Sequence, residues 1–351
     1  MNRFMSVFFR LVPLIMGAIC ITYGFYVKVL EETTGKGYIV ASHVLIALTA
    51  ICIALFTTAA TIIRQLINKY NNFYKFLLPI IGYAVSLFTV FSGVYIWKTA
   101  GDNAPYFVSG NIVFAIGLIA CCVSTVATAS TKFVLITKNE ATLKYGEKQI
   151  NAFSDFQGKI LIAVPAICAI IGFLRGFYLL FKESIPPYFI AAHVVIGLSL
   201  ICSCLIALVA SIVRQIQNIF TNEERWKWSI FVLLIGTINV LWGAMVLINC
   251  TNDAFIAPGI VLIGLGLICY SISSKVILLA AVWRREFKLA NRIPIIPVVT
   301  ALICLFLSSY LFEASLFNSA YFVPAHVMVG LGAVCFTLFS IVSILESGTS
   351  K

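Results

Sequence analysis

The most evident shortage in this sequence is of charge. Only 11% of its 351 residues are Asp, Glu, Lys or Arg, whereas 61% are hydrophobic, and the mean hydropathy is +1.04. A soluble domain normally carries about 25% charged residues, which cover its surface. The shortage therefore excludes a soluble globular protein and predicts a chain embedded in a membrane.

Groups that perform catalysis are also scarce. The chain has 13 acidic residues and three histidines. The acidic residues lie mainly in polar stretches at the membrane faces, and no acid pair, nucleophile elbow or phosphate-binding loop occurs. A haem held between His43 and His193 is conceivable, but no other feature of the sequence calls for a cofactor. We therefore expect no enzyme activity and no cofactor.

The 11 cysteines lack the spacings that redox or metal chemistry requires. Neither CxxC nor a Cys/His zinc spacing occurs, and all cysteines except Cys250 lie inside apolar runs. Cysteine behaves there as a small apolar residue. We expect no metal site and no disulfide framework.

Long apolar runs are what the sequence has in abundance. A helix needs roughly 20 apolar residues to cross a hydrocarbon core about 30 Å thick. The runs are unbroken rather than alternating, which favours helices over barrel strands. They cover residues 8–30, 38–64, 76–97, 107–131, 159–181, 188–213, 228–249, 256–282, 293–312 and 321–345.

One pattern recurs in every second run. Its five copies begin at Tyr38, Tyr106, Tyr188, Phe255 and Tyr321. The fifth residue after each start is His43, Asn111, His193, Ile260 or His326, so all three histidines of the chain occupy one repeat position. The ninth residue is always small, being Ala47, Ala115, Gly197, Gly264 or Gly330.

The repeat predicts an all-α polytopic membrane protein with ten transmembrane helices, organised as five parallel helical hairpins. Residues 1–351 then form a single transmembrane domain. The repeats cover about 8–66, 75–132, 159–216, 227–283 and 292–346.

Five equivalent hairpins are expected to close into a pseudo-fivefold ring. Helices 8 to 10 Å apart put each inner axis roughly 8 Å from the centre, which leaves a passage about 2 to 3 Å in radius. His43, His193, His326 and Asn111 would point toward this passage at one depth. The small residues one turn deeper would allow close helix packing or line a path.

Two interpretations of the histidines stay open. Each imidazole could hydrogen-bond to a neighbouring hairpin, and its recurrence would then record the duplication of one packing solution. An ionisable residue inside a membrane is nevertheless a functional candidate by default, and imidazole changes charge near pH 6.5. Lys275 lies about twenty residues into its repeat, where its aliphatic stem could carry the ammonium to the membrane surface.

Charge predicts the orientation. We assign 19 of the 24 Lys and Arg residues to the side that carries both termini, which is therefore expected to be cytoplasmic. The polar stretch 137–158 is a long cytoplasmic loop, acting as a linker or a contact site. The net charge of +11 is spread over short loops, so we expect no nucleic-acid partner.

Four segments resemble a known family. Leu11–Gly17, Ala54–Ala59, Ala290–Pro294 and Leu331–Ser340 are similar to the enterobacterial inner-membrane family called YhiM, and the similarity covers the whole chain. That family has no established biochemical activity and supplies no catalytic residues. The resemblance implies a bacterial inner-membrane protein connected with survival at low pH.

Two functions are consistent with these patterns. The first is a channel or transporter for protons or small ions and solutes, in which the histidines form a pH-sensitive cluster that contributes to acid survival. The second is a non-transporting membrane scaffold or stress sensor that acts through its cytoplasmic face. The lipid bilayer is the expected partner in both, and no protein partner can be named.

Overall fold

The computed structural model describes residues 3–34, 38–67, 69–132, 153–249, 252–283 and 286–349. Within these ranges the chain is helical and contains no β-strand, and ten helices are long and apolar enough to cross a membrane. The prediction of an all-α membrane protein with ten spans is confirmed. The spanning helices are α1 (Arg3–Thr34), α2 (Ile39–Leu66), α3 (Asn72–Thr99), α4 (Ala104–Ser130), α5 (Asp155–Leu180), α6 (Pro186–Ile216), α7 (Asn222–Ile248), α8 (Ile256–Trp283), α10 (Ile295–Ala314) and α11 (Phe322–Thr349).

The helices extend beyond the apolar runs because polar residues start them. Ser154 and Thr221 accept hydrogen bonds from the amides of Gln157 and Glu224, and each forms a capping box that begins α5 or α7. Helix α5 therefore begins at Asp155, inside the polar stretch predicted as the loop 137–158. Residues 133–152, which form most of that predicted loop, lie outside the described residues.

Helices alternate along the chain between an outer and an inner position. In α4, α6, α8 and α11, 78–89% of the residues in the most apolar 18-residue stretch are buried, and in α2 the share is 61%. The value is only 28–33% for α1, α3, α5, α7 and α10. The second helix of each hairpin is therefore the inner one.

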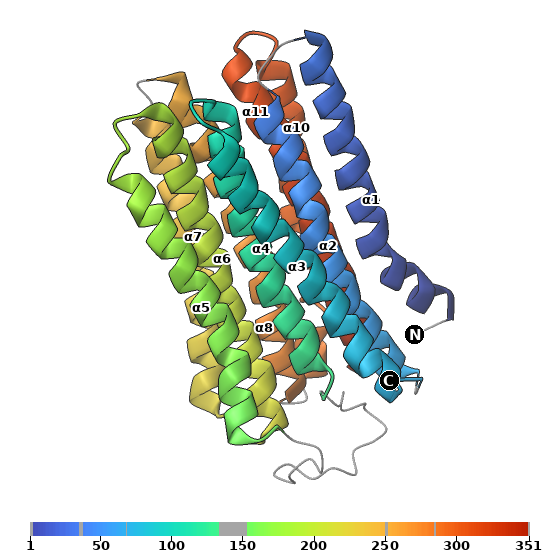
Figure 1. Cartoon of the computed structure of the whole chain (residues 1–351). Helices are drawn as coiled ribbons and strands as arrows, with labels where there is room; N and C mark the ends of the chain where they lie inside the picture. The colour runs from blue at the N-terminus through green and yellow to red at the C-terminus, as the bar shows by residue number, and fades with distance from the viewer. Residues whose placement is uncertain are drawn as a thin grey trace.

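The inner helices contact one another in a closed cyclic order. Helix α2 packs against α4, α4 against α6, α6 against α8, α8 against α11, and α11 against α2. Each outer helix lies against its own inner partner and against the inner helix of the preceding hairpin in this order. Figure 1 shows the resulting bundle of long, roughly parallel helices.

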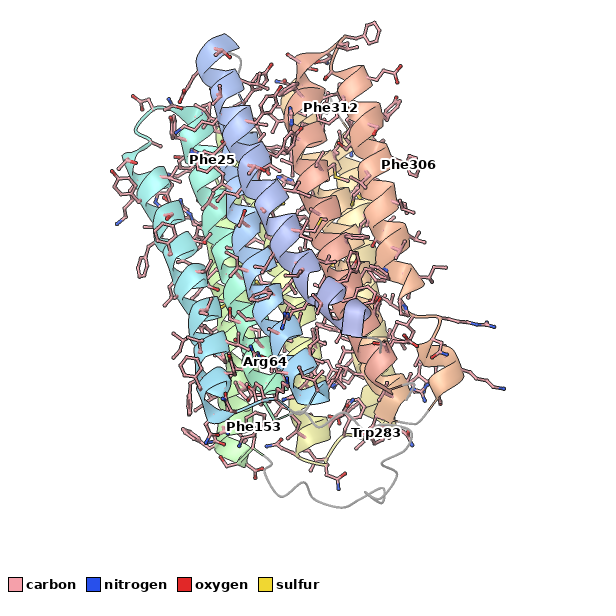
Figure 2. The ribbon with its side chains drawn as sticks, turned by 90° about the vertical axis from the view of Figure 1, so that its right-hand side faces the viewer. Phe25, Arg64, Phe153, Trp283, Phe306 and Phe312 are labelled. Atoms are coloured by element: carbon pink, nitrogen blue, oxygen red, sulfur yellow. The ribbon has the colours of Figure 1, made fainter. Side chains whose placement is uncertain are left out.

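The outer helices present large apolar side chains to the surroundings. Phe88 of α3, Phe306 of α10 and Phe76 of α3 are 73%, 73% and 66% exposed. Figure 2 shows Phe306 pointing away from the bundle. In water such a surface would be costly, whereas hydrocarbon solvates it well, so the outer faces are those expected to contact lipid.

The two ends of the bundle differ in their connections. At the hairpin end, short turns such as Ala100–Asn103 and Phe181–Ile185 join the two helices of a hairpin. At the terminal end, α1 begins and α11 ends, and the segments that join successive hairpins lie there (Figure 1). Some of them, such as Gln217–Thr221 between α6 and α7, are as short as the hairpin turns. The names hairpin end and terminal end are used below.

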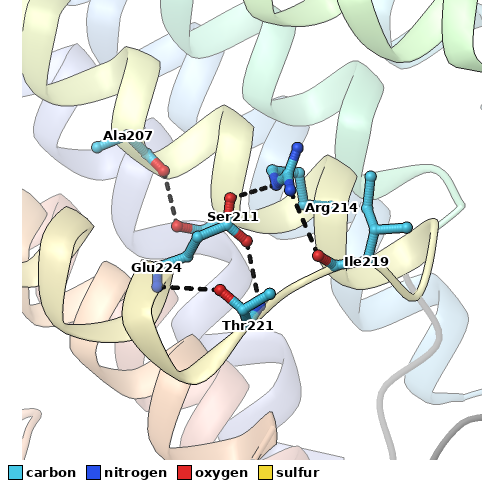
Figure 3. Close-up of polar contacts among 6 residues, drawn as sticks. All are labelled: Ala207, Ser211, Arg214, Ile219, Thr221 and Glu224. Carbon is cyan, nitrogen blue, oxygen red and sulfur yellow. Dashed lines mark hydrogen bonds and ion pairs between the residues drawn. The ribbon is translucent and has the colours of Figure 1, made fainter.

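Polar contacts hold the connections at the terminal end. Arg214 of α6 forms an ion pair with Glu224 of α7, with 2.5 Å between Nε and Oε1, beside the Thr221 cap (Figure 3). Arg225 donates to both carboxylate oxygens of Glu286, at 3.1 and 2.7 Å, and so joins α7 to the short helix α9 (Phe287–Ala290). The first pair links the end of α6 to the start of α7, and the second links the start of α7 to the segment that follows α8.

Candidate functional site

The five inner helices enclose a narrow cavity on their common axis. Its volume is about 30 Å³, which is room for a water molecule but not for an organic solute. Helix α2 lines it with Leu48, Ile51 and Leu55, and the other inner helices contribute residues spaced in the same way, by three or four positions. A mean repeat of 3.5 residues is typical of helices packed around one axis. These positions define the axial face of each inner helix.

A second cavity of about 20 Å³ continues the axis toward the terminal end. Each inner helix lines it with two residues, four positions apart. The ten residues are Thr58, Ile62, Val126, Ser130, Leu208, Ile212, Lys275, Leu279, Ile341 and Leu345. Three of these have polar side chains, and only one carries a formal charge.

That charged residue, Lys275 of α8, lines both cavities and is only 3% exposed. Within the described part of the chain it makes no hydrogen bond or ion pair with another residue, and its surroundings on the hairpin side are apolar. The expectation that its side chain reaches the membrane surface is wrong. Helix α8 packs against α6, α7, α10 and α11, and Lys275 lies on the side of α8 that faces the axis, so its side chain stays among the inner helices.

The repeat shows that Lys275 occupies a position at which the other four copies have uncharged residues. It is the twentieth residue after the fourth repeat start, and the equivalent residues in the other copies are Thr58, Val126, Leu208 and Ile341. All four equivalents line the second cavity with it. One ammonium at a position that is otherwise uncharged marks a departure from simple packing.

The predicted histidine site has a different location. His43, His193, His326 and Asn111 line neither axial cavity. At 100° per residue, the fifth repeat position lies about 100° around the helix from the mean direction of the axial face, because the sixth position is the one in phase with it. The expectation that these side chains converge on the axis is corrected accordingly: they face the seams between hairpins.

His326 of α11 occupies the seam with α1. Its Nδ1 is hydrogen-bonded to the Tyr23 hydroxyl, and its ring packs edge-on against Phe312 with centroids 4.8 Å apart. The other ring nitrogen, Nε2, is buried and has no hydrogen-bond partner. His326 therefore joins the first and last hairpins and has one unsatisfied polar atom in an aromatic environment.

The other two histidines lie at their own seams. His43 of α2 shares a hydrogen bond of 2.9 Å with Ser109 of α4, between Nδ1 and Oγ. His193 of α6 is 2.9 Å from the Phe189 carbonyl oxygen, and its ring packs edge-on against Trp242 of α7 at 5.5 Å. The three imidazoles therefore have different partners and are not brought together.

Asn111 is hydrogen-bonded to a charged side chain. Its Oδ1 accepts a hydrogen bond of 2.8 Å from Nε of Arg175 on α5, and its amide donates to the Phe107 carbonyl. The Arg175 guanidinium also stacks over the Trp97 ring of α3 at 4.0 Å. One arginine thus joins three helices at the seam between the second and third hairpins.

At each of these seams, where the outer helix of one hairpin packs against the inner helix of the preceding hairpin, the contacting residues of both helices occupy equivalent repeat positions. Tyr23, Arg175 and Trp242 each precede a glycine near the end of an outer helix, and each contacts the fifth repeat position of the preceding inner helix. Ser92, at the equivalent place in α3, lines the same groove as His43. Sequence reasoning missed this partner position, although the glycines that mark it were visible.

The three glycines at the ninth repeat position lie between neighbouring inner helices. A Cβ added to Gly264 or Gly330 would come within 2.5 Å of Leu331 or Leu48 on the next inner helix, and one added to Gly197 within 2.6 Å of Leu262. Ala115 is buried. Of the two roles considered for these positions, close helix packing fits the contacts of the glycines.

Ala47 lines a third cavity, which lies outside the ring. This lateral groove has a volume of about 310 Å³ and is bordered by α1, α2, α3 and α4. His43 and Ser92 lie at its wall together with mostly apolar side chains. Among the described residues no group of three or more His, Cys, Asp or Glu side chains is placed to hold a metal ion.

Comparison with known proteins gives two matches. The model of the family described as "Protein of unknown function (DUF2776)" matches residues 1–350. The curated protein "Inner membrane protein YhiM" of Escherichia coli (strain K12) is 52% identical over 354 residues, covering 100% of both chains. No solved structure matches.

Proposed function

The chain belongs to the family described as protein of unknown function DUF2776, and on that premise we propose that it is an inner-membrane channel or transporter-like protein for protons or small ions. The path runs along the axis of the five inner helices. Acid shifts the protein toward an open arrangement, which contributes to survival at low pH. No catalytic step is part of this proposal.

The observation that carries the proposal is the place of Lys275. A charged side chain at membrane depth costs several kcal/mol unless it is paired or hydrated. The other inner helices have Thr58, Val126, Leu208 and Ile341 at the same repeat position, so a ring that served only packing would have no use for an ammonium there. A charge that borders two cavities on the axis fits a residue that meets a passing ion or water.

The narrow axis supports a closed state of such a path. Leucine, isoleucine and valine side chains fill the axis on the hairpin side of Lys275, and the cavities are only about 30 and 20 Å³. Apolar constrictions of this kind exclude ions because they exclude water. Conduction therefore requires the inner helices to move apart or rotate.

The proposed architecture is a ring of five copies of one hairpin with pseudo-fivefold arrangement. The cyclic order of contacts among the inner helices and the shared spacing of their axial residues support it. The basic residues favour a cytoplasmic location for the terminal end, and with it both termini. The name of the E. coli relative supports the inner membrane as the location.

The seams between hairpins supply a way for pH to act. Protonation of His43, His193 or His326 places a positive charge in a seam, where His193 and His326 are packed among aromatic rings. The charge is better solvated when the seam is loosened, so acid favours the looser arrangement. If each imidazolium disfavours the closed arrangement by about 0.5 kcal/mol, three together change the ratio of states by roughly tenfold.

Reconstitution tests the proposal. The purified full chain in liposomes should release a trapped salt gradient faster at mildly acidic than at neutral pH, and the triple variant H43Q/H193Q/H326Q should lose this roughly tenfold acid response while keeping the neutral rate. The variant I260Q is the control, because it adds glutamine at the fourth copy of the same repeat position without removing an imidazole. An unchanged acid response in the triple variant would remove the histidine mechanism.

A second candidate function is a non-transporting scaffold or stress sensor. The narrow, mostly apolar centre favours it, since such a ring also suits a purely structural core. In that case wild-type liposomes would show no flux at either pH. Deletion of residues 137–152, which lie outside the described residues and leave the Ser154 cap of α5 in place, would then abolish the acid-survival phenotype in cells.

A further inference from the structure

Lys275 borders both axial cavities, and no described residue of opposite charge is paired with it. This arrangement suggests a binding site. We infer that the Lys275 ammonium binds a small inorganic anion of the size class of chloride on the axis of the inner ring. The inference deepens the proposed function by naming the class of ion. It rests on that function for the flux measurement, but not for the binding measurement.

In the described part of the chain, no carboxylate forms an ion pair with Lys275. Among the described spanning residues of the inner helices, the only acidic side chain is Glu346 of α11. Glu346 follows Ile341, the α11 residue at the level of Lys275, by five positions, which is about 7.5 Å of helix rise and 140° of rotation. Among the described residues, the ion pairs at this end join Arg214 to Glu224 and Arg225 to Glu286.

The helix dipole does not balance the charge either. The negative end of a helix stabilises cations mainly within its last turn. Helix α8 ends at Trp283, eight residues beyond Lys275, which corresponds to about 12 Å. A protonated Lys275 therefore needs a mobile counter-charge, and the adjoining cavities are the space in which one can lie.

The size of the cavities sets the class of anion. Volumes of about 30 and 20 Å³ accept a water molecule or an ion of similar size, and they exclude carboxylic acids and phosphate esters. Thr58 and Ser130 line the second cavity with Lys275 and now donate to the carbonyls of Ala54 and Val126. Each hydroxyl can rotate to donate to an anion instead, so the site offers three donors.

Access favours the terminal end. On the side of Lys275 that faces that end, the second cavity is lined by one further layer, which includes Ser130 and Leu279, whereas several apolar layers line the axis on the hairpin side. The terminal end also carries Arg64, Lys75 and Lys227, whose positive charge raises the local concentration of anions. The anion is therefore expected to enter the site from the terminal end.

Binding can be measured without any conduction. Thermal unfolding of the purified full chain, followed by tryptophan fluorescence, should occur at higher temperature in potassium chloride than in potassium gluconate of equal ionic strength, because gluconate is too large for the cavities. K275M should lose the difference between the two salts, and K275R should keep it. K288M, which removes an exposed lysine of α9, is the matched control and should also keep it. No difference in the wild type, or an equal difference in K275M, would overturn the anion site.

Flux then separates the failure of the site from the failure of the proposed function. With a potassium chloride gradient across the liposome, the wild-type reversal potential should lie near the chloride equilibrium value, and K275M should move it toward the potassium value. A cation- or proton-selective flux that K275M does not change would leave conduction standing and overturn the anion inference. Absence of flux together with a chloride-specific shift in unfolding would support the site and contradict the proposed function.

Discussion

At the scale of single residues, a few polar side chains in an apolar bundle determine how the helices are joined. Arg175 is the clearest example, because its guanidinium both donates to Asn111 and stacks over Trp97. A lysine has neither the planar face nor the directed Nε donor, so it cannot make both contacts at once. The seam between the second and third hairpins should depend on this one side chain.

The variant R175K tests this dependence. We expect it to lower the free energy of unfolding by about 1–3 kcal/mol, because a hydrogen bond to a charged group is lost and Asn111 Oδ1 is left unpaired. Unfolding in detergent measures the change, and combination with N111A should show that the two effects are not additive. The exposed Lys182 at the same end supplies the control K182Q, which should change stability by less than about 0.5 kcal/mol. Equal effects of R175K and K182Q would contradict the role of the seam.

At the scale of elements, the hairpin is held together by close approach of its two helices. A Cβ added to Gly93 of α3 would lie 2.3 Å from the backbone nitrogen of Phe114 on α4, and a backbone atom cannot move aside as a side chain can. At Gly332 of α11 the nearest atom would be 3.3 Å away. Both glycines are inside helices, so their difference lies in packing and not in backbone conformation.

The pair G93A and G332A exploits that difference. G93A should force α3 away from α4 and destabilise the protein by about 1–3 kcal/mol or more. G332A should have a smaller effect, since alanine also favours a helix over glycine by about 1 kcal/mol. Thermal unfolding of the two variants under the same conditions makes the comparison, and a loss in G332A as large as that in G93A would show that the close approach is not limiting.

At the scale of the whole molecule, the closed order of inner helices and the charge of the terminal end imply a defined orientation. Gly101 lies in an exposed turn at the hairpin end, with φ of +52° and no atom within 4 Å of an added Cβ, so an insertion there disturbs little. Helix α11 ends at Thr349, at the terminal end. The two sites should therefore lie on opposite sides of the membrane.

Reporter fusions test the orientation. Alkaline phosphatase, which is active only outside the cytoplasm, should be active when inserted after Gly101 and inactive when fused after the last residue. Green fluorescent protein, which fluoresces only in the cytoplasm, should give the opposite pattern at the C-terminus. The reverse result for both reporters would invert the assignment of the terminal end, and the anion would then reach Lys275 from outside.

The membrane-spanning segments and the assignment to helical membrane proteins follow from hydropathy, which is summed over the residues of a segment. The apolar runs around His43 or Leu331 exceed the thickness of a membrane whatever their neighbours are, so hydropathy predicts them without knowledge of packing. The same reasoning identified the repeat, because the equivalence of His43, His193 and His326 is a matter of position along the chain.

The side that each inner helix turns toward the axis depends instead on the helices packed around it. The inner helices are apolar around their whole circumference, so no polar face in the sequence indicates which side turns to the axis. Only packing decided that the tenth and thirteenth repeat positions line the axis, which carried the histidines into the seams and the single ammonium of Lys275 into the centre. A rotation of about 100° between adjacent residues separates these outcomes, and contacts between helices set that rotation.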